Sequence, residues 1–242
     1  MEAFLTSDGL VALATLAALE IVLGVDNLVF IAIVSARLPA NQQPLARKVG
    51  LAMALITRVL LLLTLSWIMG LTQPLFHVLG FGVSGRSIIL FAGGLFLIAK
   101  ATFEIYAKVE MSHEEAHAET GRRSFTSVVI QIMILDIVFS LDSVITAVGM
   151  VDNVAIMVVA IVIAMGVMLV AMERVSSFVE AHPSVKLLAL AFLILIGVVL
   201  VADAFGHHVP KGYIYFSMAF SLGVELLNLR YRSRQARRRR PA

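Results

Sequence analysis

Four acidic residues stand inside apolar runs, and together they form two copies of one pattern. In each copy two carboxylates lie six residues apart, and a small polar residue follows the second one. The copies are Glu20, Asp26 and Asn27, then Asp136, Asp142 and Ser143. An ionised carboxylate at the centre of a membrane helix costs about 2.5–3.5 kcal/mol, so these acids must be neutral, paired or bound to a cation. The pattern therefore indicates a cation pathway.

The six-residue spacing limits how both acids of one helix can serve one site. Six steps of about 100° place the second acid roughly 120° around the helix from the first. One solution is a helix that opens near Gly24 in the first copy and Ser140 in the second, where carbonyl oxygens become further ligands. The other is that one acid of each helix faces the site while its neighbour pairs with Arg58 or Lys100. A purely structural role, with these two cations neutralising the acids, also stays open.

The composition identifies the elements that must position these residues. The chain has 242 residues and is 60% hydrophobic, whereas soluble domains are nearer 45–50% apolar. Seven apolar stretches approach or exceed the roughly 20 residues that a membrane helix needs. They are 9–35, 48–70, 87–107, 125–150, 153–172, 185–205 and 212–229. We therefore expect an all-α polytopic membrane protein with seven transmembrane helices. The absence of Cys excludes disulfides and thiolate metal sites.

The two copies of the pattern also predict the topology. The second copy lies three spans after the first, so the helices that carry them run in opposite directions and the halves form a 3+3 inverted repeat plus one extra helix. The expected single transmembrane domain, 1–242, comprises repeat 1 at about 9–107, a cytoplasmic loop at 108–124, repeat 2 at about 125–205, an extra helix at 212–229 and a basic tail at 230–242. Glu104 and Asp203 lie at equivalent positions near the ends of the third and sixth spans, which is weaker support for the repeat. Both are secondary site candidates.

The basic residues predict the orientation in the membrane. Arg residues crowd the tail after residue 229, and placing that tail in the cytoplasm puts most Lys and Arg on the inside. The N-terminus is then outside, and it lacks the basic region of a cleaved signal peptide. A basic tail beside a membrane typically touches anionic lipid. We therefore expect the bilayer as a partner and no nucleic acid.

Two histidine patterns allow other chemistry. His113, Glu114 and His117 match the H-E-x-x-H pattern of zinc metalloproteases. That motif needs a third ligand and a closed cleft, whereas here it lies in a charged loop, so a plain solvated loop or a loose metal-sensing loop is the simpler interpretation. His207 and His208 lie at the expected outer mouth, where an ordinary interfacial pair is the simpler interpretation.

The paired E-x5-D-N and D-x5-D-S motifs resemble the TerC family of integral membrane proteins over essentially the whole chain. The stretches 94–100, 182–186 and 209–216 are similar to its YgdQ-like branch. The family was named for tellurium resistance, and members with assigned activity are linked to manganese export and to supplying metal to exported enzymes. The resemblance implies metal-ion handling in a bacterial inner membrane, with Glu20, Asp26, Asp136 and Asp142 as its site.

Together these observations predict a non-enzymatic exporter of a divalent cation, because carboxylate, amide and hydroxyl oxygens suit hard cations such as Mg²⁺, Ca²⁺ and Mn²⁺. Among these, the family resemblance favours Mn²⁺. We expect Asp26 and Asp142 to contact the ion first, Glu20 and Asp136 to share the site or carry protons, Asn27 and Ser143 to supply further oxygens, and Arg58 and Lys100 to balance charge. No resident cofactor is expected, and a homo-oligomer is possible. The rivals are a non-transporting membrane scaffold in stress resistance and a membrane metalloprotease.

Overall fold

The apolar runs fold as helices, because a helix satisfies its own backbone hydrogen bonds where water is absent. The computed structural model describes residues 6–64, 70–78, 81–110, 124–148 and 153–238. The helices are α1 (Ser7–Ser35), α2 (Gln43–Leu63), α4 (Gly85–Val109), α6 (Phe125–Val148), α7 (Val154–Ala181), α8 (Pro183–Ala204) and α9 (Lys211–Arg238). Two strands, β1 (Pro74–Val78) and β2 (Phe81–Ser84), pair antiparallel between α2 and α4.

Local sequence signals set where several helices begin. The Thr6 hydroxyl accepts a hydrogen bond from the Gly9 amide at the start of α1, and Ser84 does the same for Ser87 in α4. The Asn153 side chain caps α7. Pro183 begins α8, where a residue without an amide hydrogen loses no helical bond.

Four of the helices, α1, α4, α7 and α8, are long and apolar enough to cross a membrane. The described part of α6 contains a shorter apolar stretch, Phe125–Leu141. Charged residues lower the hydropathy of α2, which carries Arg47, Lys48 and Arg58. Composition therefore supports a multi-span protein, with four of the seven expected spans clearly apolar.

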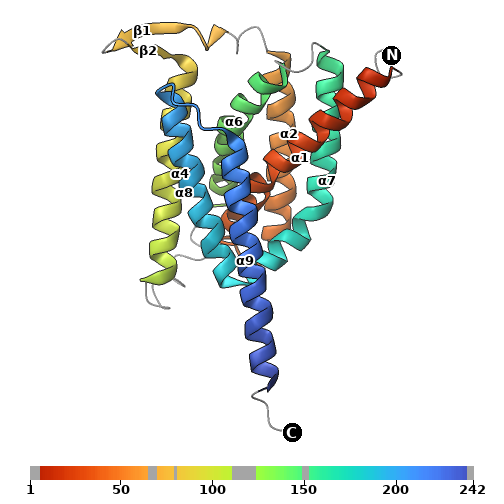
Figure 1. Cartoon of the computed structure of the whole chain (residues 1–242), viewed down its shortest axis with the longest axis vertical. Coiled ribbons are helices and arrows are strands. Elements are labelled where there is room, and N and C mark those ends of the chain that lie inside the picture. Colours follow the sequence, from red (N-terminus) through yellow and green to blue (C-terminus); the bar gives the residue numbers. More distant parts are fainter. Residues whose placement is uncertain (1–5, 65–69, 79–80, 111–123, 149–152, 239–242) are drawn as a thin grey trace.

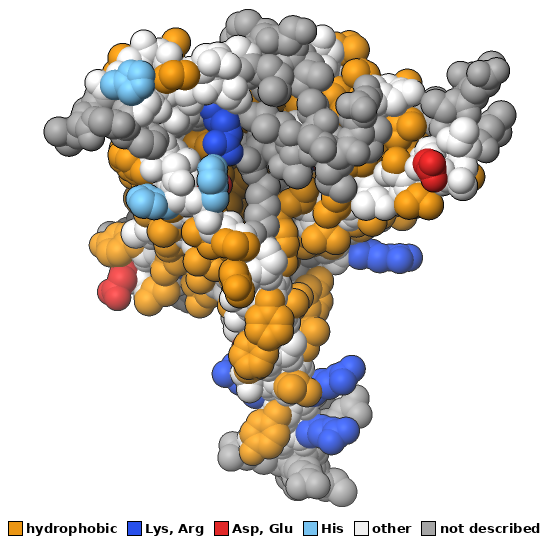
Figure 2. Space-filling model, turned by 45° about the horizontal axis from the view of Figure 1, so that its top comes forward, with side chains coloured by type: hydrophobic (Ala, Val, Ile, Leu, Met, Phe, Trp, Pro, Cys, Tyr) orange, Lys and Arg blue, Asp and Glu red, His pale blue; other side chains and the backbone are white. Residues whose placement is uncertain are grey.

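The helices run alternately up and down, and the two termini lie at opposite ends of the molecule (Figure 1). α1 packs against α7, α2 against α6 and α4 against α8. α9 contacts the bundle chiefly through α8 and extends beyond the other helices at its C-terminal end (Figure 1). Apolar side chains cover much of the outer wall in Figure 2, as lipid contact requires.

Close backbone approach fixes the α4–α8 pair. A Cβ atom on Gly94 would lie 2.7 Å from the Gly197 carbonyl oxygen, and one on Gly197 would lie 2.8 Å from the Gly94 oxygen. Glycine at both positions is what allows these backbones to touch. The contact is reciprocal, with Ile98 of α4 and Val201 of α8 flanking it on opposite sides.

Three local features differ from the expectation. The segment between the second and third expected spans, 71–86, contains the β1–β2 hairpin. α7 continues to Ala181, beyond the expected end at 172, and Glu173 and Glu180 in this extension form ion pairs with Arg47 of α2. α9 continues through most of the expected tail, to Arg238.

Candidate functional site

Arg58 of α2 joins the first acid of each motif copy. Its Nη1 donates to Glu20 Oε2 at 2.7 Å, and its Nη2 donates to Asp136 Oδ1 at 2.8 Å. Nε also donates to Asp136, at 3.1 Å from Oδ1. The exposed fractions are only 5% for Glu20, 3% for Arg58 and 4% for Asp136. One guanidinium therefore holds two buried carboxylates that come from different halves of the chain.

Asp136 accepts further hydrogen bonds from three neighbours. Asn27 Nδ2 of α1 lies 3.2 Å from Oδ1, while Thr57 Oγ1 of α2 and Ser140 Oγ of α6 lie 3.3 and 3.2 Å from Oδ2. Donors from three helices thus converge on one carboxylate. We call Glu20, Asn27, Thr57, Arg58, Asp136 and Ser140 the central cluster.

The two motif copies interlock within the central cluster. Asn27 of the first copy donates to Asp136 of the second. In the opposite sense, the Ser143 hydroxyl of the second copy interacts with the Glu20 carboxylate of the first. Ser143 Oγ also donates to the Ser140 carbonyl oxygen at 3.3 Å, which is common for a hydroxyl within a helix. Each copy therefore supports the other copy's first acid.

The helices do not open at the positions where we expected it. α1 is helical from Ser7 through Ser35, and α6 from Phe125 through Val148. Gly24 instead lets Met168 of α7 approach, since a Cβ there would lie 2.5 Å from the Met168 sulfur. Ser140 keeps a helical backbone, and its hydroxyl donates a hydrogen bond to Asp136. In α1, Glu20 pairs with Arg58 while Asp26 lies in other surroundings, and the Asp142 side chain of α6 lies outside the described residues.

Asp26 lies outside the central cluster and faces a cavity. A polar cavity of about 70 Å³ is lined by Asp26, Asn27, Arg58, Ser143, Asp203 and Tyr215, with apolar residues between them. Through the shared residues Asn27 and Arg58, this polar cavity reaches the central cluster. The Asp26 carboxylate has no hydrogen-bond or ion-pair partner among the residues that the structure describes. It is thus an acid open to a cavity, beside acids that are already paired.

Asp203 also lines the polar cavity. This carboxylate, at the end of α8, lies 3.0 Å from His208 Nδ1. His208 is 71% exposed, so the polar cavity adjoins the surface at the end of the bundle opposite the C-terminus. Asp142 belongs to α6, but its side chain lies outside the described residues.

Lys100 and Glu104 form a separate ionic group. Lys100 Nζ lies 3.9 Å from Glu104 Oε1, which also pairs with Arg37 after α1. These residues lie toward the end of α4, near its boundary at Val109. Arg58, rather than Lys100, is therefore the cation paired with motif acids among the described ion pairs.

Two residues that make buried polar contacts, Thr57 and Arg47, are not among the predicted site residues. Thr57 contacts Asp136, and its position beside Arg58 was the available signal. Arg47 bridges Glu173 and Glu180 of α7, at 3.1 and 2.8 Å, and donates to Ser35 at 3.1 Å. Such pairing between distant segments has no local sequence signal.

The described residues contain no group of three or more His, Cys, Asp or Glu side chains arranged to hold a metal. In the central cluster, Arg58 occupies the position between Glu20 and Asp136. The H-E-x-x-H segment, with His113, Glu114 and His117, lies outside the described residues.

A bundle of apolar helices around a buried ionic cluster defines an integral membrane protein. The chain belongs to the TerC family of integral membrane proteins, whose family model matches residues 5–240. The resemblance of the paired motifs to this family is thereby confirmed.

Several bacterial proteins are similar over most of this chain. A UPF0053 protein of Haemophilus influenzae is 53% identical over 92% of this chain and 94% of its own length. The inner membrane protein YgdQ of Escherichia coli is 53% identical, over 90% of this chain and 91% of its own. The inner membrane protein YoaE of Escherichia coli is 52% identical over 89% of this chain but 42% of its own length. No solved structure matches this chain.

Proposed function

We propose that this protein transports a divalent metal cation across the inner membrane, with Mn²⁺ as the favoured substrate. The observation that carries the proposal is the position of the motif acids. Glu20 and Asp136 meet on Arg58 inside the bundle, and Asp26 lies in the polar cavity that reaches them. Intramembrane ionisable groups that face a cavity are the usual markers of an ion pathway.

Arg58 is the internal counter-charge in this proposal. Glu20 and Asp136 together carry two negative charges when ionised, and Arg58 supplies one positive charge between them. A divalent cation that enters past Asp26 brings enough charge to replace Arg58 on both carboxylates. The oxygens of Asn27 and Ser143 are near enough to complete a hard-ligand set, which suits Mn²⁺ and Mg²⁺. The exchange of Arg58 for metal is the step that transport requires.

An inverted repeat would give this site two-sided access. Three helix pairs support this proposal: α1 packs on α7, α2 packs on α6, and α4 packs on α8 through the reciprocal Gly94–Gly197 contact. The interlocked motif copies lie in α1 and α6, which would correspond in the proposed repeat. Rocking of one half against the other about a central site is how many such transporters alternate access.

The charges support an orientation in the membrane. The exposed Arg230, Arg232 and Arg234 project from the end of α9 and favour a cytoplasmic C-terminus. The polar cavity and Asp203 then face outward, and export is the direction proposed. We further infer exchange for protons, because carboxylates that release a metal in a membrane interior must be neutralised again.

The second candidate is a non-transporting membrane scaffold, and one observation favours it. Arg58 already pairs with two carboxylates, and the described residues hold no three-acid or histidine metal group. In that case the central cluster only locks the helices together. The two candidates differ in whether the Asp26 and Asp142 charges are needed.

The test is cellular manganese in a host that lacks its own exporters. Cells carry the empty vector, the intact protein, or the Asp26→Asn plus Asp142→Asn variant at matched membrane levels. Transport predicts lower manganese with the intact protein and vector-like manganese with the variant. Unchanged manganese, iron, magnesium and calcium with well-inserted protein would favour the scaffold.

A further inference from the structure

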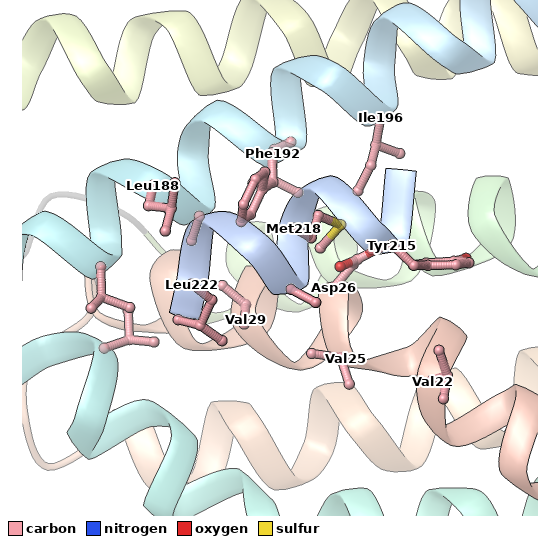
Figure 3. A pocket seen from close by; sticks show the side chains of 15 residues that line it. Val22, Val25, Asp26, Val29, Leu188, Phe192, Ile196, Tyr215, Met218 and Leu222 are labelled. Atoms are coloured by element: carbon pink, nitrogen blue, oxygen red, sulfur yellow. The ribbon is translucent and has the colours of Figure 1, made fainter. Parts of the chain in front are cut away.

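A second cavity opens between α1, α8 and α9, and it is much more apolar than the polar cavity. We call it the lateral groove; its volume is about 330 Å³. Its walls include Val25, Asp26, Phe192, Ile196, Tyr215 and Met218 (Figure 3). Among the fifteen described residues that line it, Asp26 is the one acid, and none is Lys, Arg or His. The lateral groove thus combines an apolar surface with a single carboxylate.

The geometry aims that carboxylate at the groove. In Figure 3 the Asp26 side chain points from α1 toward the part of α9 that carries Tyr215 and Met218. No ion pair to Asp26 is found among the described residues. An acid in an apolar setting is stabilised by a positive partner, and the groove walls supply none.

The position of Asp26 makes ordinary lipid a poorer match for the groove than a cation. An acyl chain would fill the apolar walls but would bring no positive charge. A headgroup ammonium would have to descend far below the surface, because Asp26 precedes the end of α1 at Ser35 by nine residues, which is about 13 Å of helix. A molecule that carries its charge within an apolar body meets both requirements.

We propose that the lateral groove binds lipophilic organic cations. The apolar body lies against Phe192, Ile196 and Met218, and the positive centre lies on the Asp26 carboxylate. The aromatic ring of Tyr215 adds a face that attracts cations. The groove volume falls within the 300–1,000 Å³ range of small-molecule sites. Because Asp26 lines both cavities, such a cation would also compete with a metal ion entering the polar cavity.

The test uses radiolabelled tetraphenylphosphonium and the full chain in phosphatidylcholine nanodiscs. We expect saturable binding to the intact protein and to Asp26→Glu, which keeps the charge. Binding should weaken at least tenfold in Asp26→Asn, which loses the charge, and in Met218→Trp, which fills the groove. Glu173→Gln, on α7 and away from the groove, is the control and should bind normally. Tetraphenylarsonium should compete, and the neutral triphenylphosphine oxide should not.

Three results would overturn the proposal: no saturable binding to folded intact protein, equal binding by Asp26→Asn, or equal competition by the neutral compound. Thermal unfolding of each variant separates loss of binding from loss of fold. The groove and the metal site are also separable. Met218→Trp should lose phosphonium binding and keep manganese transport, while Glu20→Gln plus Asp136→Asn should do the reverse.

Discussion

The Asn27 amide of the first motif copy donates a hydrogen bond to the Asp136 carboxylate of the second, at 3.2 Å and across 109 residues of sequence. This bond joins α1 to α6 inside the membrane bundle. Asp136 also binds Arg58, so a change at Asn27 acts on the same carboxylate that the guanidinium neutralises. The two copies are therefore parts of one ionic unit rather than two separate sites.

Replacing Arg58 by Met should destabilise the protein strongly. The change leaves Glu20 and Asp136 buried without their cation, and breaking a buried ion pair costs about 3–5 kcal/mol. Thermal unfolding in detergent measures this as a large loss of Tm. Arg58→Lys keeps the charge but loses the bidentate contact with Asp136, so the decrease in Tm should be smaller than for Arg58→Met. Equal Tm values for intact protein and Arg58→Met would contradict the assigned pairing.

Neutralising all three groups together should restore stability. In Arg58→Met with Glu20→Gln and Asp136→Asn, no charge of the triad remains, and such replacements of buried ion groups are often neutral or stabilising. We expect this triple variant to unfold near the temperature of the intact protein. Unfolding as low as that of Arg58→Met alone would show that the charges are not the cause of its instability.

A double-mutant cycle should measure the link between the motif copies. Asn27→Ala removes a hydrogen bond to a charged group, which contributes about 1.5–3 kcal/mol. Because Asn27 contacts Asp136 directly, the effects of Asn27→Ala and Asp136→Asn should fall short of additivity by about 0.5–3 kcal/mol. The free energy of unfolding of the four proteins gives this coupling. Strict additivity would mean that Asn27 and Asp136 do not interact.

The sequence was sufficient to predict the helical class and the positions of most helices. Hydropathy sets helix positions because lipid demands apolar surface, and Arg58 stood out as a cation within an apolar run. The family resemblance is confirmed by the family match. These features depend on local composition or on motifs, which sequence displays directly.

Other features depend on which helix faces which, and the sequence does not display this. Lys100 and Arg58 were equivalent candidates for charge balance, yet Lys100 lies beside Glu104 while Arg58 reaches two motif acids. Asp26 and Glu20 share one helix but face different surroundings. The rotation of each helix about its own axis determines which partners these side chains meet. The β1–β2 hairpin was missed because its glycines also suit an irregular loop.

Glycine substitutions should reveal the tight helix crossing. Gly94→Ala puts a methyl group 2.7 Å from the Gly197 backbone oxygen, which cannot move aside, and overpacking of this kind costs about 1–3 kcal/mol. Gly24→Ala meets only the flexible end of Met168 and should cost less. Gly166→Ala is the control, since its Cβ would meet nothing within 4 Å. Equal Tm values for Gly94→Ala and Gly166→Ala would contradict the close contact between α4 and α8.

The Arg47 contacts should behave as half-exposed ion pairs. The side chains of Glu173 and Glu180 are 50% and 40% exposed, so Glu173→Gln and Glu180→Gln should each cost at most about 1 kcal/mol, and less in high salt. Arg47→Leu should cost more, because it also removes the donor to Ser35. The free energy of unfolding of each variant, measured at low and at high salt, checks the sizes of these losses and their salt dependence. A larger loss for Glu173→Gln than for Arg47→Leu would reverse the expected order.

The most direct test of the proposed function is manganese flux in sealed vesicles. The intact protein, the triple variant without the Glu20–Arg58–Asp136 charges, and the Glu173→Gln control are reconstituted at equal density. Folding of the triple variant is established first by its Tm. We predict manganese flux, with opposite proton movement, for intact protein and control, and none for the triple variant. Equal flux with the triple variant would contradict a transport role for the central cluster, and no flux with any protein would contradict transport itself.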